Sequence, residues 1–205
     1  MKTAPVRPAA RPTYPWAQLY EMESQIIQGK PSGTRGRPRR PIPRHNTTLS
    51  LSDEEGQLLT EITATISMRV TRASQGQTGG LALHLLERRL RAISGGRLIL
   101  PDDITTWESL AMLLKLDSPQ QQMGLPLPRR KKTLPLTDEE RRLLRELTAV
   151  ISRRFPHMSQ GHIGGLALRM LASRLRSIGG TTMDLPEDVR DWDSVVRLLD
   201  TDQKE

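Results

Sequence analysis

The sequence contains no cysteine, which excludes disulfide scaffolds, thiolate metal sites and cysteine nucleophiles. Aromatic residues are scarce as well, with three Trp, two Tyr and one Phe among 205 residues. No apolar run approaches the ~18 residues that a membrane span requires, and residues 1–10 lack the apolar stretch of a signal peptide. We therefore expect a cytoplasmic protein that makes no contact with a membrane.

What the sequence does have is an excess of positive charge that is unevenly distributed. The chain carries 31 Lys and Arg against 23 Asp and Glu. Residues 1–46 have a net charge of +7 and residues 118–132 one of +4, whereas residues 47–117 and 133–205 have −2 and −1. Eight of the 15 prolines also lie in the first 46 residues, a composition typical of segments without a packed core. A basic excess of this kind makes a polyanion the default partner.

The two acidic parts of the chain are copies of one another. At an offset of 85 residues, 48–117 match 133–202 without a gap and with 36 identities in 70 pairs. Two copies favour a pseudo-twofold dimer within one chain over a solenoid, which needs three or more units. The predicted segments are a disordered Pro-rich arm at 1–43 with a short aromatic segment at 14–28, a first repeat at 44–117, a linker at 118–132 and a second repeat at 133–202.

Each repeat predicts a strand followed by two helices. An alternation of period two places the leucines of the strand on one face. A hydroxyl residue three positions before a Glu is a capping box and predicts the start of a helix. The predicted strands lie at 48–51 and 133–136, the first helices begin after Ser52 and Thr137, and the second helices begin after Ser74 and Ser159 and end at Gly95 and Gly180.

Each repeat then continues into a third short helix. Proline followed by acidic residues is a helix-start signal, and it occurs at Pro101 and Pro186. We expect Trp107 and Trp192 to pack these helices onto their own repeats, with a protein-protein surface as the alternative. Glycine pairs inside the second helices are expected to let these two helices cross closely; they are Gly79 with Gly80 and Gly164 with Gly165.

A strand and two helices in about 45 residues cannot bury a core alone. The alternating strand, the capped first helix and the Ser-capped second helix, at 44–93 and 129–178, resemble the ribbon-helix-helix superfamily of DNA-binding proteins (the MetJ/Arc type). In that superfamily two such units pair their strands into an antiparallel ribbon that enters the major groove. The resemblance implies a mainly α fold with a short two-stranded antiparallel ribbon, namely a tandem ribbon-helix-helix pseudo-dimer with a third short helix in each repeat. Two copies in one chain look like the tandem members found among plasmid conjugation regulators.

In this fold the outer face of the ribbon would contact base edges. Arg can pair with guanine and Asn with adenine in bidentate fashion; the alternative is a solvated face without a target. Pro135 departs from the family pattern, because its nitrogen cannot donate a hydrogen bond and its ring cannot reach a base edge. With the leucines turned inward, the predicted base contacts are Arg44, Asn46, Thr48, Ser50, Arg129, Lys131 and Thr133.

Free amides at the N-termini of the second helices are predicted to bind phosphate, and a glycine there would let a phosphate approach closely. The alternative is ordinary N-capping without a ligand. Arginines of the arm and linker would contact flanking phosphates or the minor groove. The predicted phosphate contacts are Ser74, Gln75, Gly76, Ser159, Gln160, Gly161, Arg35, Arg37, Arg39, Arg40, Arg130 and Lys132.

The aromatic segment of the arm contains Tyr14, Trp16 and Tyr20, which are three of the six aromatic residues. A short amphipathic segment of this kind docks either on a partner or on the core of its own chain. The sequence leaves both alternatives open.

The sequence offers no catalytic pattern. The four histidines occupy non-equivalent positions in the repeats, and the acidic runs are explained by helix capping. We expect no enzymatic activity, metal, cofactor or small-molecule substrate. The leading hypothesis is a sequence-specific regulator of transcription from a bacterial plasmid or other mobile element, bound to double-stranded DNA in the nucleoid, with a second copy or the transcription or transfer machinery as further partners. The alternatives are an accessory DNA-binding protein of a relaxosome or partition site, and a protein-protein adaptor that binds no DNA.

Overall fold

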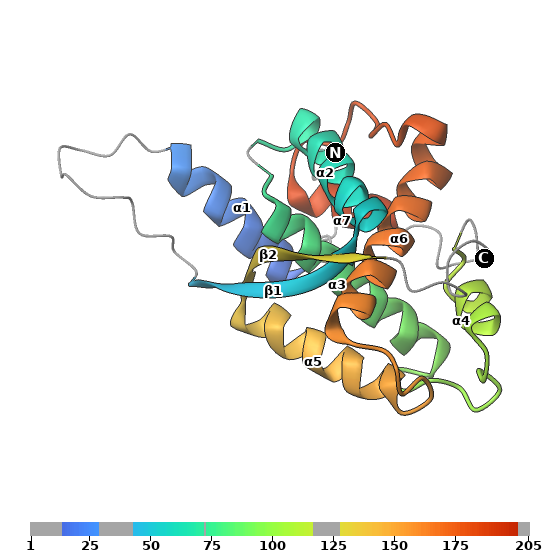
Figure 1. Cartoon of the computed structure of the whole chain (residues 1–205). Helices are drawn as coiled ribbons and strands as arrows, with labels where there is room; N and C mark the ends of the chain where they lie inside the picture. Colours follow the sequence, from blue (N-terminus) through green and yellow to red (C-terminus); the bar gives the residue numbers. More distant parts are fainter. Residues whose placement is uncertain (1–13, 29–42, 72, 117–127, 201–205) are drawn as a thin grey trace, which may run out of the picture.

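The computed structural model describes residues 14–28, 43–71, 73–116 and 128–200. Within these residues the protein is mainly helical, with seven α-helices and one sheet of two antiparallel strands (Figure 1). None of the described helices is both long and apolar enough to cross a membrane. The elements are α1 (Pro15–Gln28), β1 (Arg44–Ser52), α2 (Asp53–Arg69), α3 (Gln75–Ile93), α4 (Trp107–Leu113), β2 (Arg129–Thr137), α5 (Asp138–Ser152), α6 (Gln160–Gly179), a 3-10 turn (Gly180–Thr182) and α7 (Trp192–Asp200).

Strands β1 and β2 pair along their whole length of nine residues each to form the ribbon. The register places Thr48 opposite Thr133, and these two residues occupy the same position in the two repeats. The two leucines of each strand are at most 3% exposed, so the predicted alternation is confirmed. Strand β2 begins at Arg129, so the last four residues of the predicted linker belong to the ribbon. The ribbon thus has one face in the core and one toward solvent.

Capping boxes begin α2 and α5, as the sequence predicts. The backbone N–H of Ser52 donates to the Glu55 carboxylate at 2.9 Å, and that of Thr137 donates to Glu140 at 2.7 Å. Both glutamates are buried, with 4% and 1% of their surface exposed. Their carboxylates therefore lie where a buried cation can pair with them.

Helices α3 and α6 lie beneath the ribbon, and each packs against the strand of the other repeat. A Cβ atom at Gly76 of α3 would lie 2.2 Å from the carbonyl oxygen of Pro135 in β2. One at Gly161 of α6 would lie 2.2 Å from the carbonyl oxygen of Ser50 in β1. These glycines bring each helix against a strand backbone, a structural role that the predicted approach of a phosphate does not require.

The glycine pairs further along the same helices face the ribbon and the capping glutamates. A Cβ atom at Gly80 would lie 2.1 Å from Oε1 of Glu140, and one at Gly165 would lie 2.1 Å from Oε1 of Glu55. Helices α3 and α6 do pack against each other. The expected role of these glycines in that crossing is nevertheless corrected. Gly80 and Gly165 make room for the carboxylates that cap α5 and α2, and the first glycine of each pair adjoins leucine side chains of the ribbon.

Alanine at Gly161 is expected to lower the free energy of unfolding by about 1–3 kcal/mol, because the added methyl group overlaps a strand carbonyl that cannot move without breaking the ribbon. Gly56 of α2 is the matched control, since a Cβ atom there would have nothing within 4 Å. Gly56→Ala should instead stabilise the helix by about 0.5–1 kcal/mol. Urea unfolding of both variants measures the difference, and stabilisation of both proteins would contradict the close approach of α6 to β1.

The third helices exist but begin later than predicted. Pro101 and Pro186 each start a turn, closed by hydrogen bonds of 3.2 Å from the backbone N–H three residues later. Helices α4 and α7 begin only at Trp107 and Trp192. The polar residue before each tryptophan caps the helix, and Asp191 accepts from the backbone N–H of Ser194 at 2.6 Å. Capping thus sets these starts, and the proline signal marks the preceding turn.

Each third helix contacts the second helix of its own repeat, and a residue just after α4 also accepts a hydrogen bond from Ser173 of α6, in the other repeat, at 2.8 Å. Arg89 of α3 donates to a backbone carbonyl at the end of α4 at 3.1 Å, and Arg174 of α6 does the same to α7 at 3.1 Å. Trp192 in addition packs edge-on against Tyr20 of α1, with ring centroids 5.0 Å apart. Helix α7 therefore also binds the segment that precedes the first repeat.

The aromatic segment of the arm forms α1 and docks on the core of its own chain. Tyr20 is 2% exposed, and the ring of Trp16 stacks on His84 of α3 with centroids 4.5 Å apart. Tyr14 donates a hydrogen bond to Asp200 of α7. Helix α1 thus lies against α3 and α7 at one end of the ribbon (Figure 1), which decides between the two alternatives left by the sequence.

Candidate nucleic-acid interface

The face of the ribbon that points away from the helices brings together five of the seven predicted base contacts. Four of these side chains are exposed and one is half-buried, and the half-buried ring of Pro135 shares the face. They form three opposed pairs across the strands, so amide, hydroxyl and ammonium groups lie in one row. The pairs are Asn46 with Pro135, Thr48 with Thr133 and Ser50 with Lys131.

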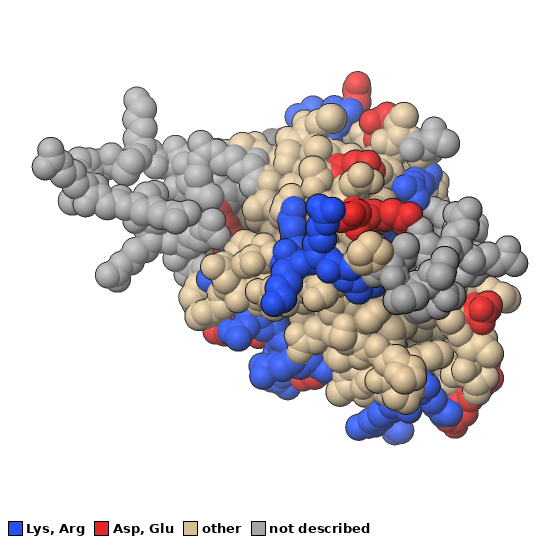
Figure 2. All heavy atoms as spheres, viewed as in Figure 1, with Lys and Arg blue, Asp and Glu red and all other residues tan. Residues whose placement is uncertain are grey.

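Lys and Arg side chains gather over the ribbon (Figure 2). Three consecutive cations belong to β2, namely Arg130, Lys131 and Lys132. Strand alternation places Lys131 on the outer face, whereas Arg130 and Lys132 stand opposite Leu51 and Leu49. The Arg130 side chain is 81% exposed and pairs with Asp53 at 3.1 Å, an arrangement that contributes only ~0–1 kcal/mol at a surface. The equivalent positions of β1, residues 45–47, hold His, Asn and Thr. The positive charge of the ribbon therefore belongs mainly to one strand, and the predicted phosphate contacts in β2 are part of the ribbon itself.

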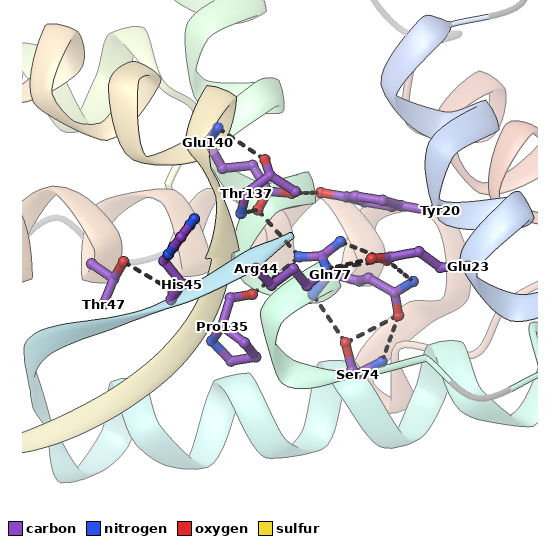
Figure 3. Close-up of polar contacts among 10 residues, drawn as sticks. All are labelled: Tyr20, Glu23, Arg44, His45, Thr47, Ser74, Gln77, Pro135, Thr137 and Glu140. Atoms are coloured by element: carbon purple, nitrogen blue, oxygen red, sulfur yellow. Dashed lines mark hydrogen bonds and ion pairs between the residues drawn. The ribbon is translucent and has the colours of Figure 1, made fainter. Parts of the chain in front are cut away.

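Arg44 is absent from this surface, although the strand alternation places it there. Its side chain is 2% exposed. The guanidinium donates to Glu23 of α1 at 2.8 Å, to Glu140 of α5 at 3.2 Å and to the carbonyl oxygen of Pro135 at 3.0 Å (Figure 3). The prediction that Arg44 contacts a base is wrong, because its long side chain turns back from the strand end to two buried carboxylates.

Tyr20 completes this buried cluster. The Arg44 guanidinium lies 5.2 Å from the centre of its ring, and its hydroxyl donates to Glu140. Burial raises the pKa of Tyr20 well above its usual range, and the charge of Glu140 raises it further. Burial by itself would lower the pKa of Arg44, but the hydrogen bond to Glu23 and the charge of Glu140 more than offset it, so the pKa is raised. Tyr20 therefore stays a hydrogen-bond donor, and the cluster fixes α1 to one end of the ribbon.

Arg129, the equivalent of Arg44 in the second repeat, is also turned away from the outer face. Its guanidinium donates to Glu55 at 2.7 Å, to the carbonyl oxygen of Ser50 at 2.8 Å and to that of Gly161 at 3.1 Å. Its side chain is 21% exposed. The predicted base contact at Arg129 is corrected for the same reason, because the guanidinium is already held by a carboxylate and two carbonyls.

The sequence contained a signal for these two ion pairs. The same Arg and the same Glu recur at equivalent positions in both repeats, which capping alone does not require. Pairing of the strands joins them across the repeats, so that Arg44 meets Glu140 and Arg129 meets Glu55. The role of Glu23 had no such signal, because nothing in the second repeat corresponds to α1.

The N-termini of α3 and α6 lie at opposite ends of the ribbon. Gly76 of α3 adjoins Pro135, which pairs with Asn46, and Gly161 of α6 adjoins Ser50, which pairs with Lys131. In both helices the third residue accepts a hydrogen bond from the capping residue. The backbone N–H of Ser74 donates to the Gln77 side chain at 3.0 Å, and that of Ser159 donates to Nδ1 of His162 at 3.1 Å. At α3 the Ser74 hydroxyl in turn accepts from the backbone N–H of Gln77 at 3.3 Å, so ordinary N-capping, the alternative to a phosphate contact, is satisfied at that helix.

The two N-termini differ in their access to solvent. Ser159 and Gln160 are exposed, whereas Ser74 and Gln75 are half-buried. At the α3 end, the amide of the Gln77 side chain also donates to the Glu23 carboxylate at 3.1 Å (Figure 3). The start of α6 is thus open to solvent at Ser159 and Gln160, whereas the start of α3 adjoins a carboxylate of α1.

Mild acid is expected to destabilise the protein through His162. Burial lowers the pKa of this imidazole, Arg129 lowers it further and Glu55 raises it, with a net lowering. Because the folded pKa lies below the unfolded value of about 6.5, the unfolded chain takes up the proton first and stability falls as the pH drops below about 6.5. His162→Gln, which installs the residue found at Gln77, should remove this part of the pH dependence of thermal unfolding. An identical pH dependence in both proteins would contradict the assignment.

The predicted phosphate contacts in the arm and a metal site are the two remaining questions about the candidate site. Arg35, Arg37, Arg39 and Arg40 lie outside the described residues. Among the residues that the structure does describe, no group of three or more His, Asp or Glu could hold a metal ion.

Comparisons of the chain with protein-family models, with curated proteins and with solved structures find no match.

Proposed function

We propose that the protein is a sequence-specific regulator of transcription that binds double-stranded DNA as a ribbon-helix-helix pseudo-dimer within one chain. The observation that carries the proposal is the two-sided ribbon, whose leucines are buried while Asn46, Thr48, Lys131 and Thr133 are exposed. A two-stranded ribbon fits the major groove, where amide, hydroxyl and ammonium groups can contact base edges. The setting on a plasmid or other mobile element comes from the resemblance to tandem conjugation regulators.

Equivalent contacts in the two repeats support the pseudo-dimer. The ribbon register is centred on the Thr48 and Thr133 pair. The second helix of each repeat contacts the strand of the other repeat at a glycine. The first residue of each strand is an arginine, and it pairs with the capping glutamate of the other repeat. Neither repeat would bury its strand and helices without the other, which is the arrangement of an obligate dimer.

The charge of the ribbon supports a nucleic-acid partner over a protein partner. The two repeats without the strand cations have net charges of −2 and −1, so the exposed cations of β2 stand out from an acidic body. Cations that neutralise phosphates release counterions from DNA and supply most non-specific affinity. The cations of β2 are therefore where DNA gains the most from binding, with Lys131 on the outer face and Arg130 and Lys132 beside it in the strand.

Titration of the full chain onto fluorescently labelled random-sequence duplexes tests the proposal. The logarithm of affinity should fall with the logarithm of salt concentration by ~0.9 for each phosphate contacted. Selection from a random duplex library should then enrich a defined motif. A protein-protein adaptor would retain no duplex at any salt concentration, and that result would overturn the proposal.

A further inference from the structure

The outer face of the ribbon has two chemically different ends. At one end Asn46 lies opposite Pro135, and at the other Lys131 lies opposite Ser50. We call these the Asn46 end and the Lys131 end. Only the central pair of threonines is the same in both repeats, so a rotation about the middle of the ribbon does not superimpose the groups offered to DNA.

The two ends suit different bases. The Asn46 amide has both a donor and an acceptor, which match N7 and N6 of adenine. The Lys131 ammonium only donates and matches the two acceptors of guanine, O6 and N7. Ser50 can donate or accept, whereas the Pro135 ring offers no polar group. Each end therefore prefers a different base pair.

The Lys131 end is also the more positively charged and the more solvent-accessible of the two ends. The Lys131 end lies beside Arg130, which is 81% exposed, and beside the exposed start of α6 at Ser159. At the Asn46 end the start of α3 is half-buried and adjoins the Glu23 carboxylate. Phosphates on the two sides of a bound site would therefore meet unequal charge.

Helix α1 contributes to the difference between the two ends of the ribbon. It docks at the Asn46 end only, where Arg44 is 2% exposed between two carboxylates, while the equivalent Arg129 at the other end is 21% exposed. The contacts of Tyr20 and Glu23 that hold α1 are themselves buried. The two ends thus differ before any DNA is bound.

We infer that the protein recognises a DNA site without twofold symmetry and binds it in a single orientation, with adenine contacted at the Asn46 end and guanine at the Lys131 end. The inference rests on the proposed function, because it assigns the specificity of the same surface. It names the residues that break the symmetry of the pseudo-dimer, namely Lys131 and Pro135 of β2.

Selection from a random duplex library with two proteins tests the symmetry. The double variant K131N/P135S places Asn, Thr and Ser on both strands and keeps the Pro135 carbonyl that accepts from Arg44. The natural chain should enrich a motif whose halves differ, and exchanging the adenine and guanine positions should lower its affinity by roughly tenfold or more. K131N/P135S should enrich an inverted repeat with adenine in both halves.

The orientation can be measured on the natural ribbon, so the result does not depend on the folding of the double variant. Because the chain has no cysteine, His157→Cys near the start of α6 provides one attachment point for an iron chelate that cleaves DNA. On the selected motif, cleavage should occur only on the side of the guanine. For K131N/P135S on its inverted repeat, cleavage should occur on both sides.

The possible outcomes separate the inference from the proposed function. An inverted repeat selected by the natural chain, or cleavage on both sides of its motif, would overturn the single orientation while leaving DNA binding intact. Failure to retain any duplex would overturn the proposed function and the inference with it. A motif with unlike halves and one-sided cleavage supports both.

Discussion

Replacing Arg44 with alanine should lower the free energy of unfolding by about 3–5 kcal/mol, which is the usual effect of removing one partner from a buried ion pair. The variant leaves the carboxylates of Glu23 and Glu140 buried and without the cation that lies 2.8 and 3.2 Å from them. It also removes the guanidinium that packs on the Tyr20 ring. Urea unfolding followed by circular dichroism measures the loss, and release of α1 should appear as a change in tryptophan fluorescence.

Two variants make the Arg44 prediction specific. Arg129→Ala should lower the free energy of unfolding by less than Arg44→Ala does, because the Arg129 side chain is 21% exposed against 2% for Arg44. Adding Glu23→Gln to Arg44→Ala should restore part of the stability, since the neutral amide needs no counter-charge. A stable Arg44→Ala protein that has lost only its preference for one DNA sequence would instead restore the base contact predicted from the strand alternation.

The parts of the fold that could be predicted depend on short-range chemistry. A hydroxyl and a glutamate three residues apart make the capping boxes at Ser52 and Thr137 recognisable in the sequence. Alternating leucines predict which face of the ribbon is buried, because successive side chains of a strand point to opposite faces. The repeat then supplies the pairing partner, since an unpaired strand with a buried face has no other stable arrangement in the chain.

The parts that could not be predicted depend on contacts between distant segments. Strand alternation fixes where the Cβ atom of Arg44 points, but the long side chain is free to turn toward Glu140, which lies 96 residues away. The glycines of α3 and α6 have two physical explanations in sequence, a bound phosphate or a close backbone, and only the position of the strands decides between them. Helix α1 has no counterpart in the second repeat, so the internal comparison that revealed the other elements gave no information about it.

The largest effect on DNA binding is expected when Arg130, Lys131 and Lys132 are all replaced with glutamine. If each cation neutralises one phosphate, the slope of log affinity against log salt should become shallower by roughly 2.7, and affinity for every duplex should fall on the order of a hundredfold or more at about 0.1 M salt. The fold should persist, since the only described ion pair that is lost is the exposed one between Arg130 and Asp53. Fluorescence anisotropy at several salt concentrations measures the affinity and the slope together.

The matched control removes the same charge from a different surface. Arg142, Arg145 and Arg153 are exposed and lie outside the ribbon, and replacing them with glutamine changes the net charge by the same three units. If DNA is held mainly by the general charge of the protein, the two triple variants should lose affinity equally. If it is held by the cations of β2, the control should keep the natural slope of log affinity against log salt and nearly all of its affinity, because cations that are not near phosphates release no counterions. Equal losses in the two proteins would therefore place the DNA elsewhere and remove the ribbon from the mechanism.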